Sequence, residues 1–114
     1  MKAVVLNKNI VVCENVLVAS KVTERVMGLM FKKELSRKKS LLISPCNSIH
    51  TCFMRFSIDV IFIDKKNVII HIIRKMKPWR FSLLYLKSKK VLELNSGSLG
   101  SDVIIGDQLE FVDV

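Results

Sequence analysis

The chain has 114 residues, 50% of them hydrophobic, and a formal net charge of +9 at pH 7. The hydrophobic fraction excludes a disordered tail, and the length is typical of one domain that buries about two thirds of its unfolded surface. No window approaches the roughly 18 uncharged apolar residues of a membrane span, and the first residues lack the pattern of a signal peptide. We therefore predict a single domain over residues 1–114, without a transmembrane segment.

The cysteine content indicates the cellular compartment. The chain contains three cysteines. Without a secretory signal, they are expected to remain reduced thiols rather than to form a disulfide framework. We therefore expect a soluble, cytoplasmic protein.

The positive charge is concentrated in one segment. No acidic residue lies between Asp64 and Glu93. The nine basic residues of this segment are Lys65, Lys66, Arg74, Lys75, Lys77, Arg80, Lys87, Lys89 and Lys90. A basic face attracts phosphate backbones and anionic membrane surfaces. The alternative interpretation is that these side chains only solvate loops and protect strand edges from pairing.

The N-terminal part of the chain predicts a β-hairpin followed by a helix. Two apolar runs, Lys2–Leu6 and Ile10–Ala19, flank Asn7-Lys8-Asn9, and asparagine tolerates the backbone conformations of tight turns. Ser20 is in the position of an N-cap for a helix over Val22–Phe31, in which apolar residues recur at helical spacing.

The rest of the chain predicts strands. The runs that we expect to form them are Leu41–Ser44, Ile49–Asp64 (as one long bent strand or two), Val68–Arg74, Phe81–Leu86, Val91–Leu94 and Leu109–Val112. One helix among many short strands predicts an α+β domain. Its expected architecture is a mostly antiparallel, curved or barrel-like sheet with one short helix packed against it.

The segment Ser48–Asp64 combines an apolar, strand-like pattern with ionisable side chains, which are costly to bury without partners. On a straight strand, Thr51, Arg55 and Asp59 share one face. One interpretation is an ionic lattice that fixes the helix against the sheet. Its predicted members are Glu24, Arg25, Arg55, Asp59 and Glu93.

The second interpretation is a pocket for a small anionic or polar ligand. Arg55 would act as a bidentate clamp, and His50 and Thr51 would orient the ligand. The complete set of predicted ligand-binding residues is His50, Thr51, Arg55, Asp59, Glu24 and Arg25.

Metal binding and catalysis have weaker support in the same segment. Cys46, His50 and Cys52 have a C-x₃-H-x-C spacing that matches no common zinc motif, so we predict no metal and no cofactor. A hydrolase that uses His50 and Cys52 needs a carboxylate to orient the histidine, and on a straight strand Asp59 points away from it. No catalytic motif is recognised elsewhere, and we therefore assign no catalytic residue.

Two blocks of the sequence carry a family resemblance. They are Glu24-Arg25-x-x-Gly28-Leu29-Met30 and Cys46-x-x-Ile49-His50-Thr51-x-x-Met54-Arg55-Phe56-x-Ile58-Asp59-Val60-x-Phe62-x-Asp64. Together with Pro78, Leu92-Glu93-Leu94, Gly97 and Gly106-Asp107, they resemble the domain of unknown function 192 family of bacteria and archaea. Ser57 departs from the proline usual in that family. The resemblance implies a compact α+β domain, and it implies no established activity, cofactor, ligand or functional residue.

The sequence therefore predicts a small binding or accessory domain with a polar pocket. Two alternatives remain open. The first is binding of nucleic acid or of an anionic surface through the basic segment, and the second is the hydrolase that uses His50 and Cys52.

Overall fold

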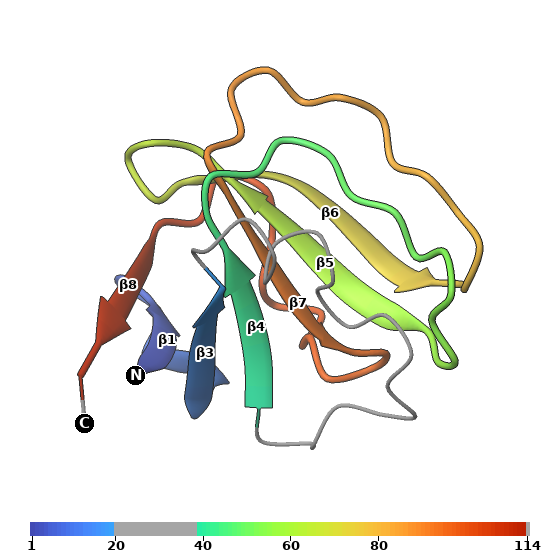
Figure 1. The fold of residues 1–114 in the computed structure, drawn as a ribbon. Coiled ribbons are helices and arrows are strands. Elements are labelled where there is room, and N and C mark those ends of the chain that lie inside the picture. The colour runs from blue at the N-terminus through green and yellow to red at the C-terminus, as the bar shows by residue number, and fades with distance from the viewer. Residues whose placement is uncertain (20–38, 114) are drawn as a thin grey trace.

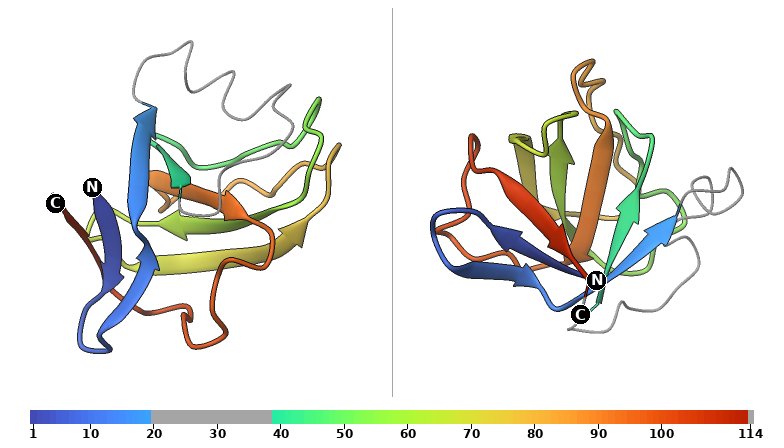
Figure 2. Two further views of the ribbon diagram at one scale, coloured as in Figure 1. Left: turned by 90° about the horizontal axis from the view of Figure 1, so that it is seen from below. Right: turned by 90° about the vertical axis from the view of Figure 1, so that its left-hand side faces the viewer.

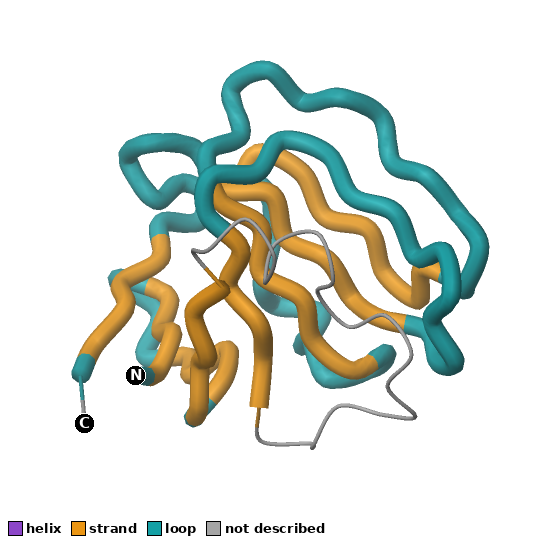
Figure 3. The backbone as a smooth tube through the Cα atoms, viewed as in Figure 1, coloured by secondary structure: helices purple, strands orange, loops and turns teal. Residues whose placement is uncertain are grey.

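The computed structural model describes residues 1–19 and 39–113, and these residues form two β-sheets (Figures 1 and 3). The smaller sheet is antiparallel and has the order β2-β1-β8, from β1 (Lys2–Val5), β2 (Ile10–Cys13) and β8 (Leu109–Val112). The larger sheet has the order β3-β4-β7-β5-β6. Its strands are β3 (Asn15–Ala19), β4 (Lys39–Ile43), β5 (Ile58–Ile63), β6 (Ile69–Met76) and β7 (Lys90–Asn95).

The prediction of an α+β domain with a barrel-like sheet is wrong. The described residues are all strands and loops, and they form two separate open sheets rather than a closed barrel (Figure 2). The run Ile10–Ala19 was expected to be one strand, but it breaks at Glu14 and its halves belong to different sheets. The predicted helix over Val22–Phe31 lies outside the described residues. Within residues 1–19 and 39–113, no helix has the length and apolar composition needed to cross a membrane.

The predicted N-terminal hairpin is confirmed. β1 and β2 pair antiparallel, and both Asn7 and Asn9 adopt positive φ angles, of 70° and 53°. Asparagine accepts this left-handed backbone more readily than most residues, which explains why the turn forms at this place.

The larger sheet is buried on both faces. One face packs with the smaller sheet around Val5, Ile61 and Leu92, and the other face forms a second cluster around Ile43, Val60 and Phe62. Every residue of β5 is buried, as expected for a strand that has an almost continuous apolar sequence and neighbours on both sides. β5 and its neighbours thus form a rigid platform for the loops around them.

Two long loops run side by side at the periphery of this platform (Figure 1). The inner loop, residues 44–57, connects β4 to β5, and the outer loop, residues 77–89, connects β6 to β7. Backbone hydrogen bonds join them along their length, from Trp79 N–H donating to Thr51 O (3.0 Å) to Cys46 N–H donating to Lys89 O (3.0 Å). The strands predicted over residues 49–57 and 81–86 are therefore wrong, since this part contains only one isolated bridge, between His50 and Phe81.

Candidate functional site

Thr51 is the residue that ties the two loops together. Its side chain is fully buried, and its hydroxyl donates to Lys77 O (2.6 Å) and accepts from Arg80 N–H (2.9 Å). Its own backbone N–H donates to Arg80 O (2.9 Å). This predicted ligand-binding residue thus uses its hydroxyl to hold the backbone of the outer loop.

Replacing Thr51 by valine keeps the shape of the side chain and removes both hydroxyl contacts. We expect Thr51→Val to lower the free energy of unfolding by about 1–3 kcal/mol, because Arg80 N–H and Lys77 O lose their partner. Chemical denaturation measures the loss, and Ser101→Ala at an exposed position provides the control. A loss no larger than that of the control would contradict the structural role of the hydroxyl.

His50 lies on the solvent side of the inner loop. Its Nδ1 accepts a hydrogen bond from the backbone N–H of Cys52 (3.2 Å), and its ring lies 6.1 Å from that of Phe81. Within the described residues, no hydrogen bond joins the imidazole to a carboxylate or a thiol. A hydrolase needs such a partner to activate the histidine. The geometry therefore gives the hydrolase hypothesis no support.

Asp59 is held by backbone amides. Its carboxylate is 1% exposed and accepts from the N–H groups of Lys75 (2.9 Å), Gly97 (3.0 Å) and Leu99 (3.0 Å). Lys75 lies where the register between β5 and β6 shifts and has a φ of 53°, so its N–H needs a partner outside the ladder. Asp59 thus fixes an irregularity of β6 and the loop after β7.

Glu93 is a buried carboxyl in the middle of β7. It is 4% exposed, and its Oε2 has no hydrogen-bond partner among residues 1–19 and 39–113. In the sheet it lies opposite Leu41 of β4 and Val60 of β5, so its two cross-strand neighbours are apolar. Burial raises the pKa of this carboxyl from 4.5 to about 8, because the charged form loses its hydration.

The predicted ionic lattice does not form among its described members. Arg55 is exposed on the inner loop, Asp59 accepts from backbone amides, and Glu93 lies opposite apolar residues of the neighbouring strands. These three side chains make no ion pair with one another. Glu24 and Arg25 lie outside the described residues.

The predicted ligand-binding residues are divided between the surface and the interior. His50 and Arg55 are exposed on the inner loop, whereas Thr51 and Asp59 are buried and hydrogen-bonded to backbone groups. Ligand binding by this set stays a prediction.

The outer loop presents large apolar side chains to solvent. Phe81, Leu83 and Leu86 are 77%, 74% and 75% exposed. Trp79 and Leu84 are also more than half exposed, and we call these five residues the apolar ridge. Monomeric proteins rarely expose so many apolar side chains within eight positions. Contiguous exposed apolar patches commonly mark interaction sites.

Two inward-facing residues of the outer loop keep the apolar ridge turned outward. Tyr85 points inward, where its ring stacks on that of His71 (centroids 4.5 Å apart) and lies at a tilt against that of Phe62 (4.6 Å). The Ser82 hydroxyl accepts from Ile49 N–H (2.9 Å). With these two anchors and the paired inner loop in place, the neighbouring side chains of the outer loop face away from the protein.

Trp79 itself sits on a strained backbone. Its φ is 62°, and Phe53, whose ring lies 4.7 Å from the indole, has a φ of 64°. Positive φ angles in bulky residues are energetically unfavourable and cluster at functional sites. Both aromatic side chains are exposed, so this aromatic pair lies at the surface.

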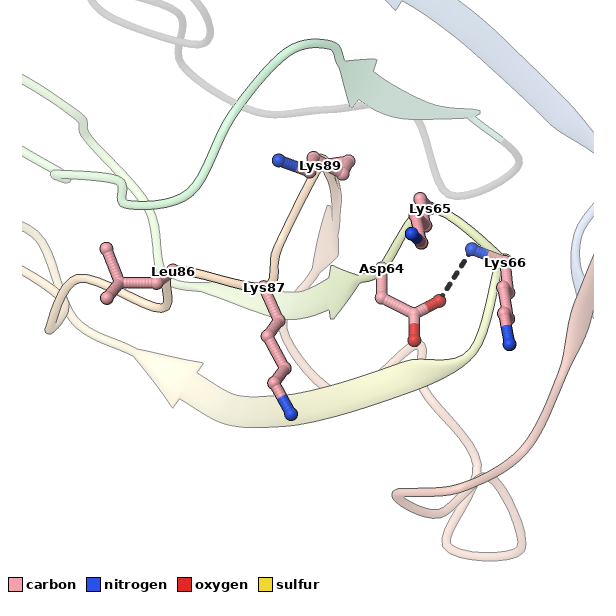
Figure 4. A pocket seen from close by; sticks show the side chains of 6 residues that line it. All are labelled: Asp64, Lys65, Lys66, Leu86, Lys87 and Lys89. Atoms are coloured by element: carbon pink, nitrogen blue, oxygen red, sulfur yellow. Dashed lines mark hydrogen bonds between the residues drawn. The ribbon is translucent and has the colours of Figure 1, made fainter.

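A pocket lies where the outer loop ends (Figure 4). Its volume is about 420 Å³, and the residues that line it are Asp64, Lys65, Lys66, Leu86, Lys87 and Lys89. We call it the lysine pocket. Its lysines come from the turn after β5 and from the end of the outer loop. Part of the basic segment seen in the sequence therefore converges on one place.

Within the described part of the chain, no three histidine, cysteine or acidic side chains lie close enough together to hold a metal ion.

Neither the apolar ridge nor the lysine pocket was predicted as a site from the sequence. The signal for the ridge was a mostly apolar run, residues 79–86, between basic residues at 77, 87, 89 and 90, but such a run also suits a buried strand.

Comparison with known proteins supplies further information. The family model “DUF192: Uncharacterized ACR, COG1430” matches residues 4–111. UPF0127 protein PF1050 of Pyrococcus furiosus is 33% identical over 94 residues, which are 77% of this chain and 78% of that protein. UPF0127 protein PH1112 of Pyrococcus horikoshii is 35% identical over 81 residues, which are 67% of this chain and 68% of that protein.

A solved structure shows the same fold. A protein of unknown function from Novosphingobium aromaticivorans superposes with a TM-score of 0.79 at 18% identity, over 97% of this chain and 84% of that one. At this identity the match concerns the fold alone.

Proposed function

This chain belongs to the DUF192 family, and from the shape and charge of its outer loop we propose that it docks on anionic lipid membranes as a peripheral binding domain. The match to the family model over residues 4–111 confirms the resemblance to the domain of unknown function 192 family that the sequence showed. The observation that carries the proposal is the apolar ridge, whose five side chains are exposed between basic residues.

The apolar ridge supplies the hydrophobic part of the interaction. Burying a leucine or phenylalanine side chain in an apolar environment gains about 1.5–3 kcal/mol. Phe81, Leu83 and Leu86 are mostly exposed before binding, so most of this gain remains available. Tryptophan favours the boundary between water and lipid, and Trp79 is at the start of the ridge.

The charges around the ridge have the sign that an anionic surface requires. Lys77, Arg80, Lys87 and Lys89 are exposed on the same loop, and the loop has no acidic residue. Each basic residue near an anionic bilayer contributes about 1 kcal/mol at moderate ionic strength. Basic residues interleaved with apolar ones are typical of segments that lie in a membrane interface.

Nucleic acid is the competing partner for a basic face, and the composition of the ridge argues against it. Single strands bind through aromatic rings on which bases stack. Leu83, Leu84 and Leu86 offer no such ring, yet they are as exposed as the aromatic residues. Aliphatic side chains at the contact surface favour lipid.

We propose a cytoplasmic location together with this function. The cytoplasmic leaflet carries anionic lipids and a negative surface potential. The three cysteines support the same compartment, because reduced thiols persist there.

The test is a pair of matched double variants. We expect Leu83→Ser with Leu84→Ser to weaken binding to phosphatidylglycerol vesicles by about a hundredfold, since about 3 kcal/mol of apolar transfer is lost. Ile104→Ser with Ile105→Ser removes two exposed apolar residues of another loop and should bind like the wild type. Co-sedimentation with vesicles over a range of lipid concentrations gives both values.

Three results would contradict the membrane proposal. The first is equal binding by the two double variants. The second is no binding of the wild type to anionic vesicles at low salt. The third is a stable dimer in light scattering that the Leu83 and Leu84 substitutions dissociate, because the ridge would then be the interface between two copies.

A further inference from the structure

We propose that the lysine pocket is a binding site for a phosphate monoester group. The proposal goes beyond membrane docking. The two proposals share Leu86, Lys87 and Lys89, whereas Asp64, Lys65 and Lys66 belong to the pocket alone. Four lysines and one aspartate surround about 420 Å³, which suits a phosphate group together with part of the molecule that carries it (Figure 4).

The backbone around the pocket is fixed. Asp64 Oδ1 accepts from the N–H groups of Lys66 (2.8 Å) and Val68 (3.0 Å), which closes the turn after β5. Lys89 N–H donates to Ile63 O (2.8 Å), the last residue of β5. Both walls of the pocket are thus attached to the end of the same buried strand. Hydrogen bonds thus hold the backbones of Lys66 and Lys89.

The charge of the pocket is uncompensated. The side-chain charges of its lining residues are four positive and one negative. In the part of the chain that the structure describes, none of the four ammonium groups makes an ion pair or a side-chain hydrogen bond. The single carboxylate, Asp64, already accepts two backbone hydrogen bonds on one oxygen. The lining of the pocket therefore has a net charge of +3, which favours an anionic ligand.

The chemistry of lysine favours a phosphate. Lysine binds phosphate as a compact point charge with three donors, and several lysines around one group add their fields. A carboxylate ligand has half the charge of a phosphate dianion and gains less from such a site. Because the four side chains come from two segments, they surround the group from two sides.

The phosphate monoester has two sources, a soluble molecule or a lipid headgroup. Titration calorimetry with phenyl phosphate probes the first source. Vesicles that contain phosphatidic acid, compared with phosphatidylglycerol vesicles, probe the second, because only phosphatidic acid has a monoester headgroup. The pocket variant is Lys65→Gln with Lys66→Gln, which lies outside the apolar ridge. The control, Lys39→Gln with Lys75→Gln, removes the same charge from exposed positions outside the pocket.

We expect the pocket variant to lose at least about tenfold in affinity for phenyl phosphate or for phosphatidic acid, and the control to lose less than about twofold. A loss for phenyl phosphate identifies a soluble ligand, and a loss for phosphatidic acid alone identifies a headgroup. Equal losses in the two variants, or no binding of either probe by the wild type, would overturn the proposal. Phenyl phosphate binding without vesicle binding would support the pocket and contradict the membrane function, so the two failures are distinguishable.

Discussion

Replacing Asp59 by alanine is expected to lower the free energy of unfolding by about 3–6 kcal/mol. The substitution leaves three backbone N–H groups, those of Lys75, Gly97 and Leu99, without their acceptor, and an unsatisfied buried donor costs about 1–3 kcal/mol. Since small domains are stable by only about 5–15 kcal/mol, the variant should be close to unfolding at room temperature. Urea denaturation monitored by circular dichroism measures the loss.

Two further variants separate the role of Asp59 from general effects of charge. Asp113→Ala removes an exposed carboxylate and should change stability by less than about 0.5 kcal/mol. Asp59→Asn keeps one acceptor oxygen but places an NH₂ group against amide donors, so its loss should be intermediate. A loss in Asp59→Ala within the range of the Asp113 control would show that the three amides find other partners.

Glu93 is expected to make the protein less stable as the pH rises from about 4.5 to 8. The unfolded chain releases the Glu93 proton near its ordinary pKa of 4.5, whereas the folded chain keeps it until about 8. Between these values the folded state binds more protons, so the free energy of unfolding falls with increasing pH and levels off above 8. The difference corresponds to about 5 kcal/mol at most for this one group.

Glu93→Gln removes this titration. The glutamine side chain resembles the protonated acid, so the variant and the wild type should have similar stability near pH 4.5. Above pH 6 the variant should be the more stable of the two, by an amount that grows to pH 8. Urea denaturation at a series of pH values tests this, with Glu110→Gln at an exposed position of β8 as the control. A constant difference between Glu93→Gln and the wild type across the series would refute the buried, protonated Glu93.

Local sequence signals predicted several elements of the fold well. The hairpin at Asn7–Asn9 follows from the backbone tolerance of asparagine. Of the strand expected over Ile49–Asp64, the last and most apolar part forms, as β5 over Ile58–Ile63. Leu109–Val112 forms a strand with the expected bounds. In each case neighbouring residues in the sequence determine the structure.

The loop pair could not be predicted in the same way. The run Phe81–Leu86 has the composition of a strand, but its partner is the irregular inner loop, and Thr51 at a distance of 29 residues holds it. Whether such a run is covered depends on what the tertiary fold places over it. The exposure of Phe81 and Leu83 therefore could not be read from the sequence.

The partners of the ionisable residues were also hidden in the sequence. An aspartate in an apolar strand suggests an arginine partner, but backbone amides satisfy Asp59. Every residue except proline carries such an N–H group, so the sequence does not indicate which ones will bind the carboxylate. The basic segment was visible as a charge imbalance. Its convergence on the lysine pocket depends on the hydrogen bond between Lys89 and Ile63, which no charge pattern reveals.

The fluorescence of Trp79 tests membrane docking most directly. Trp79 is the single tryptophan of the chain and is 56% exposed at the start of the apolar ridge, so its emission reports on the proposed contact without labelling. On addition of phosphatidylglycerol vesicles, we expect the emission to shift to shorter wavelength and to be quenched by lipids brominated on the acyl chain. Both effects should weaken as salt is raised, because part of the attraction is electrostatic. Emission that stays at the wavelength of the free protein, with no quenching by brominated lipid, would contradict membrane docking through the apolar ridge.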